Sequence, residues 1–98
     1  MNILKEQNGS ELVIKLEGRL DTSTSPQLEE ELKTALDGIG ALAFDLSALE
    51  YISSAGLRVL LSAQKVMNKQ GSMVVRGANE DIMEIFDVTG FADILTIE

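Results

Sequence analysis

The sequence predicts an α/β domain in which helices pack on a small mixed β-sheet. Two stretches support the sheet: apolar and polar residues alternate over Leu12–Leu16, and a short unbroken apolar run covers Ala41–Leu46. Alternation is typical of a half-buried strand, and an unbroken run beside glycine favours a central strand covered on both faces. Helical periodicity separates the two stretches, and a chain of 98 residues suits one domain, residues 1–98.

The N-terminal part of the chain predicts a β-hairpin. A weakly patterned strand is expected near residues 2–7, and Asn8-Gly9 after it is a strong signal for a two-residue turn. The second strand is expected near residues 11–17, with Gly18 as its end. A hairpin pairs its strands antiparallel, so the sheet becomes mixed if parallel crossovers follow.

Three helices are predicted, near residues 26–37, 54–70 and 80–88. The first begins at Ser25-Pro26, because proline is tolerated at the first helical position, and the last begins at Asn79 as a cap. Apolar residues recur at helical spacing and define the faces that we expect to be buried. They are Leu28, Leu32, Ala35 and Leu36 in the first helix, and Val59, Leu60, Ala63, Val66 and Met67 in the second.

A further strand is expected near residues 72–76. The chain then contains two strand–helix–strand units, which build parallel sheet. Asp45 is expected to stand at the carboxyl end of the central strand, where sites gather in open α/β sheets. The last residues, 91–98, are expected to pack on the sheet or its helices.

The composition argues against several classes of chemistry. The chain contains no cysteine and no histidine, which removes disulfides, thiolate or imidazole metal sites and Ser-His-Asp catalysis. No nucleotide-binding loop follows any strand, so no cofactor is expected. Carboxylates are plentiful, and a carboxylate-based hydrolase stays as a distant third interpretation, but nothing pairs two of them with a pocket. We therefore expect no catalytic residue, no metal and no enzymatic activity.

The net charge narrows the choice of partner. At −8 it argues against nucleic acid, whose phosphates would repel the protein, and it suits a basic protein surface. No apolar run is long enough to span a bilayer, and the N-terminus shows no secretory signal. The absence of cysteine is compatible with a reducing compartment, so we expect a cytoplasmic protein.

A pair of serines, Ser53-Ser54, opens the second predicted helix. Serine is a preferred helix cap, and the first turn of a helix offers unpaired N–H groups to a phosphate. From spacing alone, the simpler interpretation is that Ser53 caps the helix and Ser54 is its first residue. Ser54 shares an outer stripe, at i, i+4, i+7 and i+11, with Arg58, Leu61 and Lys65. This neighbourhood predicts a contact patch.

The residues around these serines resemble a known family. Asp45-Leu46-Ser47, then Tyr51-Ile52 and Ser53-Ser54-Ala55-Gly56-Leu57, is similar to the signature of STAS domains, the family of bacterial anti-sigma factor antagonists. Gly18-Arg19-Leu20-Asp21 and Phe86-Asp87-Val88-Thr89-Gly90 extend the resemblance over nearly the whole chain. The resemblance implies a single STAS-like domain with helices mainly on one face of the sheet.

The resemblance also implies a function. In the family, a partner kinase phosphorylates the serine at the position of Ser54; the residue before it is often Asp, where this chain has Ser53. The implied partners are an anti-sigma factor with serine kinase activity, released by phosphorylation, and a serine phosphatase that restores binding. The implied partner-binding residues are Asp21, Thr22, Ser53, Ser54, Gly56, Leu57, Arg58, Leu61 and Lys65. The alternative is a binding module of the same fold in another signalling or transporter-associated complex.

Overall fold

A computed structural model describes all 98 residues of the chain. The strands are β1 (Asn2–Asn8), β2 (Glu11–Leu20), β3 (Ala41–Ile52) and β4 (Ser72–Arg76). The helices are α1 (Ser25–Ala35), α2 (Ser54–Gln70), α3 (Glu80–Thr89) and α4 (Phe91–Ile94). The four strands form one sheet in the order β1-β2-β3-β4, in which β1 pairs antiparallel with β2 and the other pairs are parallel. The predicted mixed α/β fold is confirmed.

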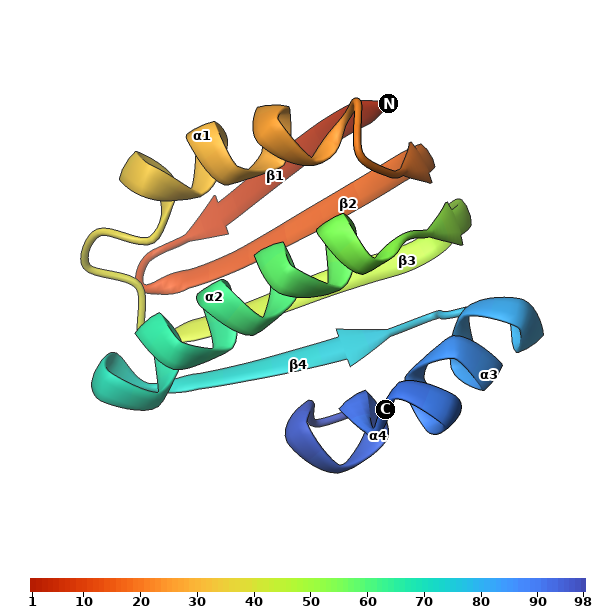
Figure 1. The fold of residues 1–98 in the computed structure, drawn as a ribbon. Helices are drawn as coiled ribbons and strands as arrows, with labels where there is room; N and C mark the ends of the chain where they lie inside the picture. Colours follow the sequence, from red (N-terminus) through yellow and green to blue (C-terminus); the bar gives the residue numbers. More distant parts are fainter.

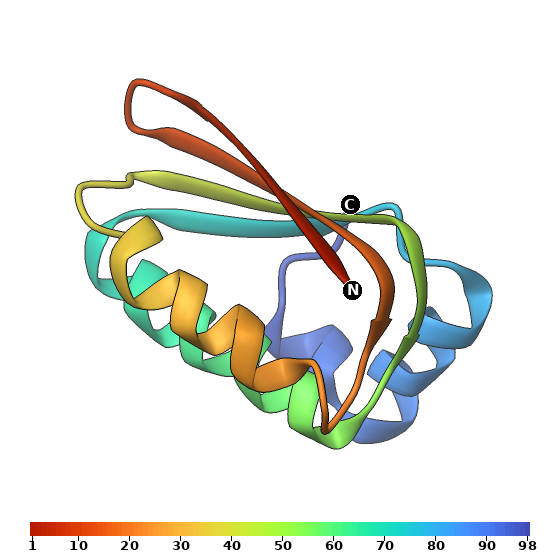
Figure 2. The same ribbon diagram turned by 90° about the horizontal axis from the view of Figure 1, so that it is seen from above.

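The helices gather on one side of the sheet. Helices α1 and α2 lie side by side against that face, and α3 and α4 lie beyond the edge formed by β4 (Figure 1). Seen from above, the opposite face of the sheet carries no helix (Figure 2). The chain ends beside β4, where Ile97 bridges to Val75 and Leu95 is buried, as expected for the closing segment. None of the helices combines the length and the apolar character that a membrane span requires.

The core lies between the sheet and the helices. Strand β2 turns Leu12, Ile14 and Leu16 into it, as the alternation predicted. The stripe predicted for α1 is buried at its three leucines, and only Ala35 is half-buried. Close contact between backbones adds to this packing, because a side chain on Gly71, at the end of α2, would collide with the carbonyl group of Gly40.

One residue of the predicted inner face of α2 is not in the core. Val66 is 40% exposed, whereas Val59, Leu60, Ala63 and Met67 are buried. Val66 lines a depression of about 200 Å³ between α1 and α2, which no other segment covers. The prediction for Val66 was wrong because periodicity gives the direction of a side chain but not whether a neighbour reaches it.

The N-terminal hairpin turns one residue later than predicted. Asn8 pairs with Glu11, so the two turn residues are Gly9 and Ser10 and not Asn8-Gly9. Gly9 has φ 63° and no residue other than glycine has a positive φ, which is the pattern of a type II′ turn. A glycine at the first turn position takes this conformation without steric cost, which explains the shift.

The two central strands run further than the sequence predicted. Gly18 does not end β2: it adopts φ 104° inside the strand and pairs with Leu49. Strand β3 does not end at Leu46, so Asp45 stands within the strand and not at its carboxyl end. Two register shifts insert extra residues into β3 opposite β2 and break the apolar–polar alternation. The sequence pattern therefore did not indicate the second half of the strand.

Candidate partner-binding surface around Ser54

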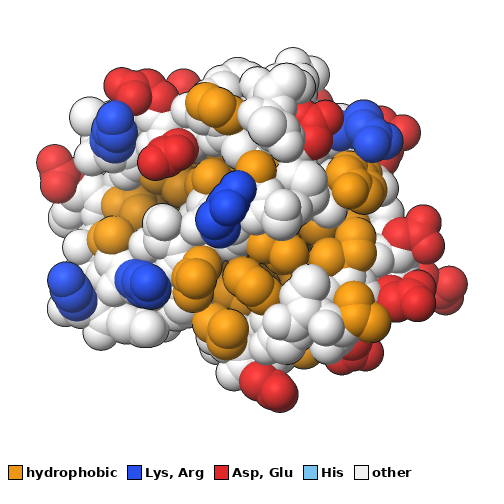
Figure 3. All heavy atoms as spheres, in the orientation of Figure 1, with side chains coloured by type: hydrophobic (Ala, Val, Ile, Leu, Met, Phe, Trp, Pro, Cys, Tyr) orange, Lys and Arg blue, Asp and Glu red, His pale blue; other side chains and the backbone are white.

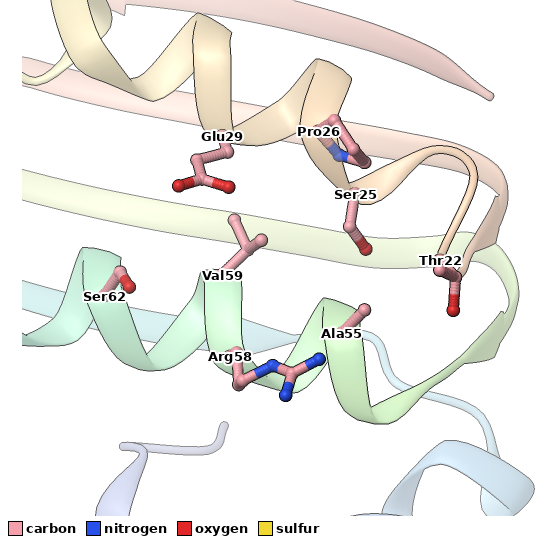
Figure 4. Close-up of a pocket in the computed structure, with 8 residues that line it drawn as sticks. All are labelled: Thr22, Ser25, Pro26, Glu29, Ala55, Arg58, Val59 and Ser62. Carbon is pink, nitrogen blue, oxygen red and sulfur yellow. The ribbon is translucent and has the colours of Figure 1, made fainter.

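Pairing of β2 with β3 brings two distant segments of the chain together. The strands end side by side, with Leu20 opposite Ile52, and the N–H of Ser53 donates to the carbonyl of Leu20 at 2.9 Å. The loop after β2 therefore lies beside the first turn of α2. Thr22 from this loop and Ala55 from α2 line the same surface groove (Figure 4).

Ser53 is the N-cap of α2, as predicted. Its backbone is extended, at φ −98° and ψ 176°, and its hydroxyl accepts a hydrogen bond from the N–H of Gly56 at 3.4 Å. The N–H of Leu57 donates to the carbonyl of Ser53 at 2.9 Å. Ser53 is half-buried and its hydroxyl is engaged, so its main role in the structure is to start the helix.

Ser54 is the first residue of α2 and is exposed. Its hydroxyl takes part in no hydrogen bond within the protein, in contrast to that of Ser53. The first turn of α2 contains no acidic side chain, so the positive end of the helix dipole has no carboxylate beside it on this helix. Ser54 therefore offers a free hydroxyl at a position where negative charge is favoured.

Gly56 and Leu57 lie beneath the surface. A Cβ atom on Gly56 would come within 2.7 Å of Leu20 Cγ and 2.8 Å of Ile52 Cγ1, so only glycine allows α2 to approach the ends of both strands this closely. Leu57 is 4% exposed and belongs to the core. Gly56 has no side chain and that of Leu57 is buried, so both residues fix the position of Ser54, and their contact with a partner stays a prediction.

Asp21 structures the loop beside Ser54. Its Oδ1 accepts hydrogen bonds from the hydroxyl of Ser23 at 2.8 Å, from the N–H of Ser23 at 3.0 Å and from the N–H of Thr24 at 3.2 Å. The Ser23 hydroxyl, followed by these N–H groups, holds the pKa of Asp21 below its ordinary value despite opposing desolvation. Asp21 is half-buried, whereas the neighbouring Thr22 is exposed. The carboxylate is thus ionised at neutral pH and directed mainly to its own loop.

Asp45 lies away from this surface, although the sequence suggested a site there. Its Oδ1 accepts hydrogen bonds from the Ser47 hydroxyl at 2.7 Å and from the Ser47 N–H at 3.0 Å, at the first register shift of β3. These bonds, the hydroxyl first, lower the pKa of Asp45, and the charges of Lys15 and Arg76 act in the same direction. Asp45 therefore stabilises the local conformation of β3 at this register shift.

A groove of about 350 Å³ runs between α1 and α2 next to Ser54. Arg58 and Glu29 face it from opposite helices but form no ion pair (Figure 4). Its lining residues are Thr22, Ser25, Pro26, Glu29, Ala55, Arg58, Val59 and Ser62. Sequence analysis missed the contribution of α1, whose only signal was the helix start at Ser25-Pro26 beside the polar loop.

The helical face combines apolar and charged areas. A basic side chain lies near its centre with apolar side chains around it, and acidic side chains together with further basic ones lie toward the rim (Figure 3). Arg58 and Lys65 are exposed on the predicted outer stripe, and Leu61 is half-buried there. Beside the loop, the guanidinium of Arg19 lies 4.6 Å from the ring centre of Tyr51. The structure shows no group of three or more acidic side chains able to hold a metal ion.

Comparison of the sequence with known proteins identifies relatives along its full length. Residues 2–98 match the family model described as STAS domain. The chain is 30% identical over 98 residues to the anti-sigma-B factor antagonist of Bacillus subtilis, covering 99% of this chain and 90% of the relative. It is 32% identical over 104 residues to the anti-sigma-B factor antagonist of Listeria monocytogenes, covering 100% of this chain and 90% of the relative.

Solved structures share the fold. An anti-sigma factor antagonist from Mycobacterium paratuberculosis gives a TM-score of 0.87 at 26% identity, covering 98% of this chain and 83% of that one. The anti-sigma factor antagonist SpoIIAA in its unphosphorylated form gives 0.78 at 17% identity, covering 99% of this chain and 87% of that one. At 17% identity, the likeness to SpoIIAA concerns the fold alone. The match of the family model over residues 2–98 shows that this chain belongs to the STAS domain family.

Proposed function

We propose that the protein is an anti-sigma factor antagonist, that it binds an anti-sigma factor with serine kinase activity, and that phosphorylation of Ser54 by this partner ends the binding. The observation that carries the proposal is the free, exposed hydroxyl of Ser54 at the start of α2. It lies beside a groove formed with the loop after β2. Relatives named anti-sigma-B factor antagonists, which match this chain over nearly its whole length, support the choice of partner.

The effect of a phosphate at Ser54 follows from its charge. A phosphoserine adds about −1.5 to −2 charges at neutral pH and three strong acceptor oxygens. At the N-terminus of α2 this charge is compatible with the fold, because the helix dipole and unpaired N–H groups accommodate it. At an interface with a partner, the same group must be desolvated and would meet any opposing carboxylate. Phosphorylation then blocks the surface without refolding the domain, and a serine phosphatase would restore binding.

The decisive test is phosphopeptide mapping after incubation with the cognate kinase and ATP. We expect one phosphate, on Ser54, and none after Ser54→Ala, which should still bind the anti-sigma factor. Ser53→Ala is the matched control, since it removes the neighbouring hydroxyl and should remain a substrate. Phosphate on Ser53, Thr22 or elsewhere would refute the site. Equal affinity of the phosphorylated and unphosphorylated forms would favour a constitutive binding module in another complex.

The proposed binding surface can be tested separately with Leu61→Asp. Leu61 is half-buried on the outer stripe of α2, so an acidic side chain there should weaken binding to the anti-sigma factor while most of the thermal stability remains. Val88→Asp provides the control, because Val88 is 77% exposed on α3, outside the proposed surface. Equal affinity of both variants would place the interface elsewhere. A large loss of stability in Leu61→Asp would show that Leu61 acts in packing, since a buried unpaired charge is costly.

The proposal includes the absence of intrinsic catalysis and a cytoplasmic location. The surface around Ser54 contains one carboxylate in the groove, Glu29, and the chain has no histidine or cysteine to act as base or nucleophile. Purified protein should therefore release no phosphate from ATP. Hydrolysis that a single point mutation abolishes would contradict this part of the proposal.

A further inference from the structure

Arg58 is placed one helical turn after Ser54. Residues four apart on a helix lie on the same face, with Cβ atoms about 5–6 Å apart. The side chain of Arg58 extends back toward the first turn of α2, beneath Ala55 (Figure 4). This is the usual direction of long side chains on helices, which lean toward the N-terminus. The guanidinium thus lies on the side of Ser54.

Arg58 has no partner within the protein. The three ion pairs join Lys5 to Glu31, Arg19 to Asp21 and Lys33 to Glu30. Glu29 lines the opposite wall of the groove without pairing with Arg58. The exposed guanidinium therefore keeps its five N–H donors available for an anion.

The remaining charged groups around Ser54 do not offer the same interaction. Glu29 on α1 and Asp21 on the loop are acidic and would repel a phosphate. Arg19 already lies over the ring of Tyr51 and 3.9 Å from Asp21. Lys65 is on the same stripe of α2 but about 10 Å further along the helix axis. Arg58 is thus the free cation nearest to Ser54 along the helix.

We propose that Arg58 is the intramolecular counter-ion of phosphorylated Ser54. The inference rests on the proposed function, which assigns the phosphate to Ser54. The phosphate oxygens would accept charge-assisted hydrogen bonds from the guanidinium, whose planar fork suits this geometry. Phosphorylation then acts twice on the surface: it adds negative charge, and it occupies the arginine that has no partner in the unphosphorylated protein.

The test measures the second pKa of the phosphoserine itself. The full chain is prepared with phosphoserine at position 54 by genetic encoding, and its phosphorus NMR signal is titrated at about 0.1 M salt. A nearby cation favours the dianion, so Arg58 should hold this pKa below the usual value of about 6. Arg58→Gln should raise it by about 0.2–0.4 units, as expected for a helical pair at this spacing.

Two further variants make the test specific. Lys65→Gln removes the same charge from the same stripe and should raise the pKa by no more than about 0.1 units, because the distance and the salt weaken its effect. Arg58→Lys keeps the charge and should keep the lowered pKa. Equal shifts for Arg58→Gln and Lys65→Gln, or a rise in Arg58→Lys as large as in Arg58→Gln, would overturn the inference.

The pKa measurement tests the role of Arg58 independently of the proposed function. Encoded phosphoserine requires neither kinase nor anti-sigma factor, so a missing shift would overturn only the role of Arg58. A kinase that phosphorylates a different residue would overturn the proposed function and leave the measured pKa values unchanged.

Discussion

Helices α2 and α3 both begin with unpaired backbone N–H groups and a positive dipole end, and the residues that compensate them differ between the two helices. Both begin with a polar cap: Ser53 accepts from Gly56 N–H, and Asn79 Oδ1 accepts from Ile82 N–H at 2.8 Å. Helix α3 adds Glu80 and Asp81 in its first turn, whereas the first turn of α2 contains no acidic residue. Helix α3 is therefore compensated permanently by carboxylates, and α2 leaves its positive end available. Under the proposed function, a phosphate on Ser54 supplies the negative charge that α3 carries in its sequence.

The largest expected effect comes from the contact that fixes α2. Gly56→Ala would place a methyl group 2.7 Å from Leu20 Cγ, and such overpacking typically costs about 1–3 kcal/mol of unfolding free energy. Gly40→Ala is the matched control, because its nearest neighbour would be 3.8 Å away. Chemical denaturation of both variants measures the difference. Equal stability of the two variants would show that α2 can shift without cost. The packing at Gly56 would then not fix the N-terminus of α2.

Loss of the caps should rank second and should differ between the two helices. Asn79→Ala should cost about 1–2 kcal/mol, because the cap is short and Asn79 Nδ2 also donates to the carbonyl of Leu49 at 3.2 Å. Ser53→Ala should cost about 0.5–1 kcal/mol, because its hydrogen bond is longer, at 3.4 Å. Urea unfolding measures both. The reverse order would mean that the geometry of these bonds does not determine their contribution.

Substitutions that change the charge of the first turns should alter the unfolding free energy less than loss of a cap does. The effects should be of opposite sign in α2 and α3. Ser54→Asp should stabilise the protein by about 0.3–1 kcal/mol, since it places a carboxylate at the uncompensated end of α2. Glu80→Gln should destabilise α3 by a similar amount of about 0.3–1 kcal/mol. Thermal unfolding at low and high salt measures the effect, which salt should reduce. Destabilisation by Ser54→Asp would contradict the view that α2 is open to negative charge.

The smallest expected effect is a change in the pKa of Asp21. It tests whether the Asp21 carboxylate already compensates the positive N-terminus of α2. Its pKa lies below the ordinary value of 3.8, mainly because of the Ser23 hydroxyl. Ser23→Ala should raise this pKa, whereas Ser54→Ala should leave it unchanged in an NMR titration. Because the folded-state pKa is depressed, the stabilisation is present above the unfolded value and is lost as pH falls through the folded value. A clear shift in Ser54→Ala would show that Asp21 already serves the N-terminus of α2.

Local signals in the sequence predicted much of the structure. Alternation, apolar periodicity and capping residues located α1, α2, α3 and the start of each strand, and Ser53 caps α2 as expected, but the short helix α4 was not predicted. The exposure of Ser54 and Arg58 followed from helical spacing alone. These features depend on residues close in the chain, for which local periodicity is informative.

Features that depend on distant residues could not be predicted. The second half of β3 is a strand because it pairs with β2 through two register shifts, and its own residues do not alternate. The exposure of Val66 depends on how far α1 stands from α2. The groove needs residues of α1, which lie nearly thirty positions before Ser54. Tertiary packing decides each of these outcomes, and one strand or helix alone carries no signal for it.

The pairing of Leu20 with Ile52 also determines when the candidate surface can exist during folding. Parallel pairing joins segments that are far apart in the chain, and such contacts form only after a costly loop closure. A peptide covering α2 alone would contain Ser54 and Arg58 but would lack Thr22 and the strand ends that hold the first turn in place. A partner that recognises the whole surface would therefore bind the folded domain and ignore nascent or unfolded chains.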